Sequence, residues 1–238
     1  MKTVLTHFYN EEYLLPWWLE HHKKYFDHGI LVDQRSTDNS VEIIKQICPT
    51  WQIVRSKNDL FDCDGTDREM QELEANLTGW RTSLTVTEFL CGDYGLLDRT
   101  DKDQFLVKVF VMIDQPDQIN NCPTYDQSLI EQKSFGYWDH GYRHARSIHT
   151  KEVLYRHGRH WIDVTTDDLA IFWYGWCPWN ECTKARKLQI QHRIPKHDVD
   201  RGFGHQHHVT SEQLEEAYHA RLRVPAQDMK IVFPLAYK

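Results

Sequence analysis

The chain has 238 residues and a formal net charge of −7, because 35 Asp and Glu residues outnumber 28 Lys and Arg residues. This length is enough for one domain with a sizeable buried core. The acidic balance argues against broad electrostatic binding to nucleic acid or to an anionic membrane, and no apolar run is long enough to span a bilayer. The first residues lack the apolar segment of a signal peptide, so we expect a cytoplasmic protein.

Through residue 112 the chain alternates between strand-like and helix-like segments. Apolar residues recur at helical spacing between Glu11 and Phe26, and Asn39 with Glu42 resembles a capping box. The predicted strands cover residues 4–8, 29–32, 51–54, 80–86 and 105–112, and the predicted helices cover residues 11–26, 41–47 and 67–76. This alternation predicts an α/β fold with a mostly parallel central sheet flanked by helices.

Beyond residue 112 the pattern is less regular. Residues 115–139 are polar and rich in turn formers, as in a long active-site loop. Short strands are predicted at residues 147–149, 153–155 and 170–173, and helices at 181–191 and 211–222, the last with Ser211 as its N-cap. Because no repeat or low-complexity linker divides the sequence, we expect a single domain over residues 1–238.

Polar loops follow two of the predicted parallel strands. The sequence Tyr-Asn-Glu-Glu at residues 9–12 follows the first strand, and the oxygen-rich segment from Asp33 to Ser40 follows the second. Ligands of open α/β sheets bind at the carboxyl ends of the strands, so these loops predict a small-molecule site. The alternative for Asp38 and Asn39 is that they only cap the following helix.

Three segments together resemble the GT-A glycosyltransferases of the family-2 type, which use nucleotide sugars. They are His7–Glu12, Asp33–Ser40 and Thr85–Leu90. The resemblance implies a GT-A type nucleotide-binding fold with an irregular C-terminal acceptor region. Residues 1–112 would form the nucleotide-sugar-binding half, and residues 113–238 the acceptor-binding and catalytic half. The compact chain is also similar to short glycosyltransferase domains of phages and large algal viruses, which implies a virus-encoded protein acting in a host cytoplasm.

The resemblance also implies how the donor is held. A nucleoside-diphosphate sugar, expected to be a UDP-hexose, would contact the two polar loops and the end of the fourth strand. An Asp33 carboxylate in this position accepts a hydrogen bond from a uracil N–H or a ribose hydroxyl. The donor-binding residues expected on this basis are Tyr9, Asn10, Glu11, Asp33, Ser36, Asp38 and Thr87.

A divalent cation is the cofactor that the resemblance implies. Members of the family usually carry Asp-x-Asp where this chain has Thr85-Val86-Thr87, followed by Glu88. Since Mn²⁺ and Mg²⁺ prefer hard oxygen ligands, we expect weak binding through Glu88, with His205 and His207 of the Gly-rich segment 202–208 reaching the same ion. The alternatives are that Glu88 is a surface acid and that these histidines are ordinary surface residues.

For catalysis, the resemblance directs attention to the segment around Glu181. The family places an acidic pair near this point, and its second acid acts as the general base of an inverting transfer to a hydroxyl. In this chain Asn180 stands where the first acid is usual. Glu181 is therefore the expected base and Asp168 the reserve, while a helix N-terminus also favours Glu without any catalytic role.

The expected acceptor is a glycan or a glycoprotein, and two other readings stay open. One is a catalytically silent nucleotide-sugar or glycan-binding module that has lost its metal carboxylates. The other is a His-rich metallohydrolase, prompted by fifteen histidines, although the first half lacks an HxxxH motif. A basic segment from Arg143 to His160 either faces a diphosphate or forms ordinary ion pairs.

Overall fold

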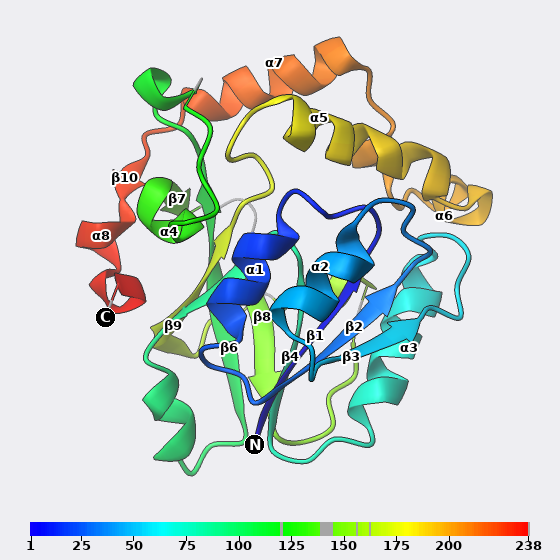
Figure 1. Cartoon of the computed structure of the whole chain (residues 1–238), viewed down its shortest axis with the longest axis vertical. Coiled ribbons are helices and arrows are strands. Elements are labelled where there is room, and N and C mark those ends of the chain that lie inside the picture. The colour runs from blue at the N-terminus through cyan, green and yellow to red at the C-terminus, as the bar shows by residue number, and fades with distance from the viewer. Residues whose placement is uncertain (120, 139–144, 156, 162, 238) are drawn as a thin grey trace.

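A sheet of ten strands organises the molecule, with helices packed against it (Figure 1). The computed structural model describes residues 1–119, 121–138, 145–155, 157–161 and 163–237. The strands are β1 Lys2–Phe8, β2 His28–Asp33, β3 Gln52–Arg55, β4 Trp80–Thr85, β5 Glu88–Gly92, β6 Gln104–Met112, β7 Phe135–Trp138, β8 Ala145–His149, β9 Thr166–Trp173 and β10 Gln227–Asp228.

The helices occupy most of the connections between these strands. The α-helices are α1 Leu15–His22, α2 Ser40–Ile47, α3 Cys63–Glu74, α4 Leu129–Gln132, α5 Glu181–Leu188, α6 Lys196–Asp200, α7 Ser211–Leu222 and α8 Met229–Val232. The 3₁₀ turns are η1 Tyr94–Asp98, η2 Pro116–Gln118, η3 His157–Arg159, η4 Gln189–Arg193, η5 His205–His207 and η6 Pro234–Tyr237. Within the described ranges, none of the helices has the length and apolar character needed to cross a bilayer.

The first four strands form a parallel unit in the order β3-β2-β1-β4. Successive residues of β1 point to opposite faces of the sheet. Val4 packs in the main core with Trp18 of α1 and Ile44 of α2, whereas Leu5 packs on the other side with Met70 of α3. Helices therefore cover both faces, and the middle of β1 is buried on both sides of the sheet. The predicted α/β class is confirmed.

Among the described strands, every antiparallel pair contains at least one strand that comes after β4 in the sequence. β8 runs antiparallel to both β4 and β6, and β7 runs antiparallel to β6. β9 is parallel to β6 and antiparallel to β5. Strands from both sides of residue 112 thus belong to one sheet, because β4 is joined to β6 through β8.

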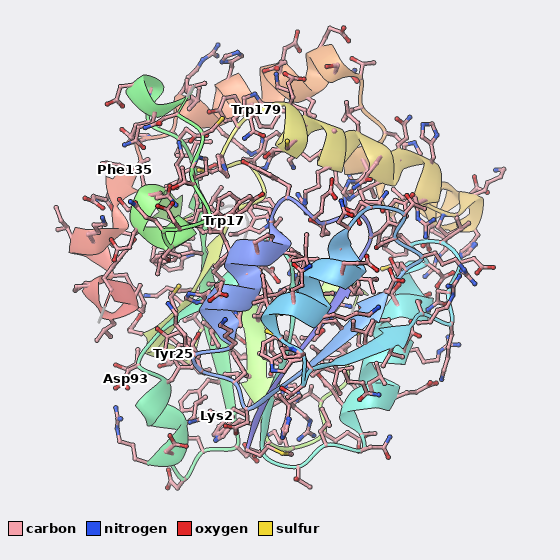
Figure 2. The ribbon with its side chains drawn as sticks, viewed as in Figure 1. Lys2, Trp17, Tyr25, Asp93, Phe135 and Trp179 are labelled. Carbon is pink, nitrogen blue, oxygen red and sulfur yellow. The ribbon has the colours of Figure 1, made fainter. Side chains whose placement is uncertain are left out.

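A second core lies beyond the carboxyl end of β6. The indole rings of Trp176 and Trp179 stack at 5.6 Å between centroids, and Trp179 stacks on Tyr218 of α7 at 4.3 Å (Figure 2 shows Trp179 before α5). The buried Asp114 carboxylate accepts from Lys133 Nζ at 2.7 Å and from Trp179 N at 2.7 Å. One carboxylate therefore joins the β6 end, the start of β7 and the segment before α5.

Several predicted boundaries are wrong. The first helix begins at Leu15 rather than Glu11, because Leu14 N and Leu15 N both donate to Glu11 O in a turn. The N-cap of α7 is Thr210, one residue before Ser211, and it forms a full capping box with Gln213. Asn39 precedes α2 without a side-chain capping bond.

Two predictions of irregular or strand structure are also wrong. The range 115–139 was expected to be a loop, yet its described part contains η2, α4 and β7. Residues 153–155 form no strand. In both cases the local sequence is ambiguous, and pairing with distant segments, such as β7 with β6, decides the outcome. Residues 120 and 139 lie outside the described residues.

Candidate functional site

The parallel part of the sheet contains a topological switch point between β1 and β4. The chain proceeds from β1 to β2 and β3 on one side, and then crosses to β4 on the other side. In the register, His7 is paired with Thr85 and Phe8 with Asp33. The carboxyl ends of β1, β2 and β4 therefore meet at one edge, where ligands of such sheets bind.

The two polar loops at this edge are held together by their own side chains. Asn10 N donates to Ser36 Oγ at 3.1 Å, and Asn10 Oδ1 accepts from Thr37 N at 2.7 Å. Asn10 has a φ of 49°, which Asn tolerates better than most residues. Glu11 N donates to Ser40 Oγ at 2.9 Å. The structure thus brings the predicted donor residues together and uses several of them to fix the loops.

The two aspartates of the second loop make local bonds. Asp33 Oδ1 accepts from Ser36 N at 2.8 Å, which closes a tight turn directly after β2. Asp38 accepts from Ser40 N at 3.0 Å and from Glu12 N at 3.0 Å. Asp38 therefore helps to begin α2, as the capping alternative expected. Asp33 is half-buried at the strand end.

Glu11 anchors the C-terminal half of the chain to this edge. Glu11 is only 7% exposed, and its side chain forms a two-point ion pair with Arg186 of α5, with Nη2 at 2.8 Å from Oε1. Burial raises the pKa of Glu11, and the Arg186 guanidinium opposes that shift. A charged pair in this setting fixes α5 across the loops that follow β1 and β2, as Figure 1 shows.

The turn after α5 covers Tyr9. The Arg193 guanidinium of η4 lies 4.0 Å from the centre of the Tyr9 ring, and Gln189 Nε2 donates to Asn10 O at 3.2 Å. The edge of Phe61 contacts the same tyrosine at 6.2 Å between ring centres. A nucleotide base that stacks on Tyr9 would therefore replace the Arg193 guanidinium.

The end of β4 differs from the predicted metal site. Glu88 is 3% exposed, so it is not a surface acid, and its Oε1 lies 2.7 Å from Arg146 Nη2. Its Oε2 accepts from Thr85 N at 2.8 Å. The hydroxyls of Thr85 and Thr87 bond each other at 2.8 Å, and Trp173 Nε1 donates to Thr87 Oγ1 at 3.0 Å. These residues do not fit a divalent cation, because a guanidinium already neutralises the buried carboxylate.

Arg146 and Arg159 of the basic segment belong to a buried polar network with acidic partners, so the ion-pair alternative is confirmed for these two residues. Arg159 Nη1 lies 3.0 Å from Asp67 Oδ1, and Arg159 Nη2 lies 3.1 Å from His7 Nδ1. Arg146 Nη1 donates to Arg159 O at 2.9 Å. Burial lowers the pKa of His7 well below its ordinary value, and the charges of Arg159 and Arg146 lower it further. Two guanidinium groups therefore act on His7 at the end of β1, and each of them is also paired with a carboxylate.

The two histidines expected to join Glu88 lie elsewhere. His205 is exposed, and its Nδ1 lies 3.0 Å from Gly202 O within the same turn. Burial lowers the pKa of His207 to about 4, and the nearby charges of Lys187 and Arg186 add to this shift. Among the described residues, Glu88, His205 and His207 do not form a group with ligand atoms close enough for one ion. The cations around His207 also disfavour a metal there.

The two candidate bases lie toward opposite edges of the sheet. β9 is parallel to β6, and β6 has the direction of β4 because both are antiparallel to β8. Asp168 is the third residue of β9 and therefore lies toward the amino-terminal edge. Glu181 comes after the end of β9, on the side of the polar loops, where its 90% exposed side chain is 2.9 Å from Lys184 Nζ.

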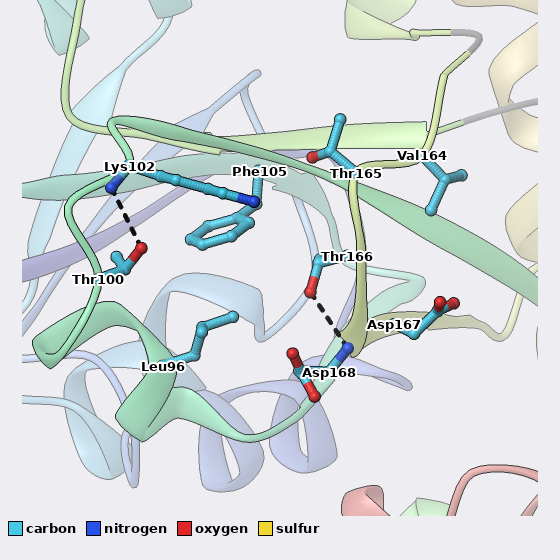
Figure 3. A pocket seen from close by; sticks show the side chains of 9 residues that line it. All are labelled: Leu96, Thr100, Lys102, Phe105, Val164, Thr165, Thr166, Asp167 and Asp168. Atoms are coloured by element: carbon cyan, nitrogen blue, oxygen red, sulfur yellow. Dashed lines mark hydrogen bonds between the residues drawn. The ribbon is translucent and has the colours of Figure 1, made fainter.

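Asp168 lines a pocket of about 480 Å³ that is separate from the polar loops (Figure 3). The other lining residues come from η1, the link from η1 to β6, the start of β6, the segment before β9 and the start of β9: Leu96, Thr100, Lys102, Phe105, Val164, Thr165, Thr166 and Asp167. Asn180, the residue directly before Glu181, is the N-cap of α5, since its Oδ1 accepts from Thr183 N at 3.0 Å. This bond gives Asn180 a capping role at the start of α5.

One cluster of possible metal ligands was missed entirely by sequence reasoning. Asp62, His197 and Asp198 bring one ligand atom each to within 4.8 Å of one another. Asp62 is 135 positions before His197, so no local spacing predicts the cluster. For Arg146 there was a weak signal, a basic residue beside a predicted strand, but nothing in the sequence paired it with Glu88.

Comparison with known proteins yields partial structural similarities. A scan against protein-family models finds no match, and a search of curated proteins finds none either. S. aureus TarS 1–349 matches with 13% identity over 52% of this chain and 37% of that chain, at a TM-score of 0.33. It has also been solved with UDP-GlcNAc.

A second similarity is with glucosyl-3-phosphoglycerate synthase from Mycobacterium tuberculosis in complex with Mn²⁺ and UDP-glucose. It has 16% identity over 47% of this chain and 43% of that chain, with a TM-score of 0.33. A complex of the same enzyme with Mn²⁺, UDP and glucosyl-3-phosphoglycerate reaches 63% of this chain and 56% of that chain, with a TM-score of 0.35. This chain therefore spans well under two thirds of these proteins.

Proposed function

We propose that this protein is a glycosyltransferase that moves a sugar from a nucleoside-diphosphate sugar to a hydroxyl of a glycan or glycoprotein acceptor. UDP-hexose is the first candidate donor. One observation carries the proposal: the polar loops after β1 and β2 meet the turn after β4 at the switch point of a parallel sheet. The donor would lie against Tyr9, Asn10, Asp33, Ser36 and Thr87.

The charge distribution at this edge supports an anionic donor. Arg146 neutralises Glu88 and Arg159 neutralises Asp67, so two carboxylates that would repel a diphosphate are compensated. The same arginines lower the pKa of His7. In a protein of net charge −7 the charges at the β1–β4 junction are therefore balanced, so a diphosphate meets less repulsion there. Binding at this point requires no cation on Glu88.

The proposed reaction inverts the anomeric carbon. The acceptor oxygen forms a bond to that carbon, the bond from the carbon to the diphosphate oxygen breaks, and its electron pair leaves with the diphosphate. The hydroxyl proton passes to a carboxylate base. We assign this role to Glu181 because it follows the carboxyl end of β9, on the side of the polar loops. Asp168 lies toward the other edge.

The base assignment is tested by a matched pair of substitutions. Glu181→Gln should lower turnover by about 10²- to 10⁴-fold and leave donor affinity unchanged, because only proton transfer is affected. Asp168→Asn should leave both quantities near those of the wild type. A collapse of turnover in Asp168→Asn with full activity in Glu181→Gln would transfer the assignment to Asp168.

The donor site is tested at Asp33. Asp33→Ala should weaken UDP binding by about 1–3 kcal/mol, the usual cost of leaving polar partners without a bond. Asp33→Asn keeps an acceptor for Ser36 N, so it separates the loss of charge from the loss of the turn. Titration calorimetry measures both. Unchanged UDP affinity in Asp33→Ala would show that the donor does not bind at the end of β2.

A second function is favoured by a specific observation. The β4 end offers no free carboxylate pair, since Glu88 is occupied by Arg146 and the hydroxyls of Thr85 and Thr87 bond each other. A nucleotide-sugar or glycan-binding module without catalytic activity would have this appearance. A panel of UDP-sugars, with and without glycan acceptors, separates the two functions. Binding without release of UDP in any combination would favour the silent module.

A further inference from the structure

Possible metal-ligand atoms of three residues gather where the start of α3 meets α6. His197 Nε2 lies 2.7 Å from Asp62 Oδ2 and 3.7 Å from Asp198 Oδ1. Asp62 uses its other oxygen to cap α3 through Gly65 N, so Oδ2 is directed at the histidine. Asp198 likewise uses Oδ2 to accept from Cys63 N at 2.8 Å. One oxygen of each aspartate thus shapes the backbone, and the other oxygen faces His197.

The second observation is the state of Asp198 Oδ1. Asp198 is 1% exposed, and this oxygen is buried without a hydrogen-bond partner. The nearest guanidinium nitrogen, Arg201 Nη1, is 3.7 Å away and is instead 2.7 Å from Asp64 Oδ2. Leaving a carboxylate oxygen buried and without a donor is costly. A bound cation removes that cost.

The charges and the distances suit a metal ion. Among the described residues, Asp62 and Asp198 each direct a carboxylate oxygen at His197, and Arg201 Nη1 is 3.7 Å from Asp198 Oδ1. Metal bonds from Zn²⁺ to imidazole nitrogen and to carboxylate oxygen are about 2.0–2.2 Å long, so ligands of one ion stand roughly 3–3.5 Å apart. The two distances from His197 Nε2 bracket that range. His197 is 58% exposed, which leaves an open side for water or another ligand.

We infer that Asp62, His197 and Asp198 form a binding site for a divalent transition-metal cation, with Zn²⁺ or Mn²⁺ as the occupant. Two carboxylates and one imidazole select these ions over Mg²⁺ and Ca²⁺, which prefer oxygen ligands alone. The site is distinct from the Glu88 position that the family resemblance implied, and it does not depend on the proposed glycosyl transfer.

The site has a structural consequence for the fold. Phe61 N donates to Arg193 O at 2.8 Å, and Arg193 Nη2 donates to Asp59 O at 2.8 Å, so the segment before α3 is already bonded to η4. A cation shared by Asp62 and the two residues of α6 adds a stronger link at the same junction. It stabilises the native chain by mass action, because the ligands come together only on folding.

The test uses the full chain after treatment with a chelator. Calorimetry with Zn²⁺, Mn²⁺ and Mg²⁺ alone should give one Zn²⁺ per chain, weaker Mn²⁺ binding and no Mg²⁺ binding, following the usual order of affinities. His197→Gln alters an exposed side chain and should retain the fold. We expect it, and Asp198→Asn, to weaken Zn²⁺ binding at least about tenfold and to abolish the thermal shift that Zn²⁺ produces.

Matched controls distinguish this site from the other histidines. Asp200→Asn removes an exposed carboxylate two residues further along α6, and His205→Gln removes an exposed histidine from η5. Both should bind Zn²⁺ as the wild type does. Zn²⁺ binding that survives His197→Gln, that is lost only in His205→Gln, or that is absent from the wild type would overturn the proposal.

Discussion

The β4 end and the α3–α6 junction contain the same kinds of side chain, yet they suit different chemistry. At the β4 end both oxygens of the buried Glu88 are occupied, one by Arg146 and the other by Thr85 N. At the α3–α6 junction a buried oxygen of Asp198 has no donor, and an imidazole stands beside it. A buried carboxylate oxygen can therefore bind a cation where no donor bonds to it directly, as at Asp198, but not where a guanidinium already does, as at Glu88.

The first prediction concerns the β4 end, where we expect the largest loss of unfolding free energy. Arg146→Met should cost about 3–5 kcal/mol of unfolding free energy, because it leaves Glu88 buried without a partner. The double variant Arg146→Met with Glu88→Gln should recover much of that loss. Urea unfolding of the two variants measures the difference. Arg99→Met, which removes an exposed pair with Asp93, is the control and should have a far smaller effect.

If Arg146→Met were no more destabilising than Arg99→Met, Glu88 would not depend on the guanidinium. The β4 end would then be open to a cation after all, and the contrast between the two regions would disappear.

A second prediction concerns how the buried histidines make stability depend on pH. Burial lowers the pKa of His21 to about 4, and the pKa values of His22 and His7 are also lowered by burial. Below pH 6.5, the ordinary value for histidine, the unfolded chain takes up protons that the native chain refuses. Stability is therefore lost as the pH falls from about 6.5 toward 4.

The size of this effect follows from the same shift. His21 alone should remove about 2 kcal/mol of unfolding free energy between pH 7 and pH 5, since one pKa unit corresponds to about 1.4 kcal/mol. Unfolding curves at pH 7, 6 and 5 measure it, and His21→Gln should flatten the dependence. An equal slope in the wild type and in His21→Gln would show that His21 is protonated in the native state.

A third prediction, with the smallest change in unfolding free energy, distinguishes the helix-capping role of Asp62 from its cation-binding role. Without metal, Asp62→Ala should cost about 1 kcal/mol because α3 loses its N-cap, whereas Asp62→Asn should cost little because Asn caps as well. With Zn²⁺ present both variants should lack the stabilisation seen in the wild type. Zn²⁺ stabilisation retained in Asp62→Asn would exclude this carboxylate from the cation site.

The parallel unit could be predicted because its signals are local. The strand-like segment Val4–Phe8 and the polar turn after it predict the first strand, and the rule for parallel sheets then places both loops at one edge. Helix starts were less certain. Thr210 and Ser211 are both good N-caps, and only the bond from Gln213 N to Thr210 Oγ1 decides between them.

The chemistry of the site could not be predicted in the same way, because it depends on pairs far apart in sequence. Glu88 meets Arg146 58 residues away, Glu11 meets Arg186 175 residues away, and Cys63 N meets Asp198 135 residues away. Each residue taken alone reads as an ordinary charged side chain. The register of β8 and the path of α5 and α6 decide which charges neutralise one another.

The most direct measurement is a crystal structure of the full chain grown with UDP and Mn²⁺, with anomalous scattering recorded for manganese. We expect the nucleotide to lie against residues 9–12 and 33–40, the Glu88–Arg146 pair to be intact and no manganese to be bound to Glu88. Nucleotide density in the pocket beside Asp168, or a manganese peak on Glu88, would contradict this expectation.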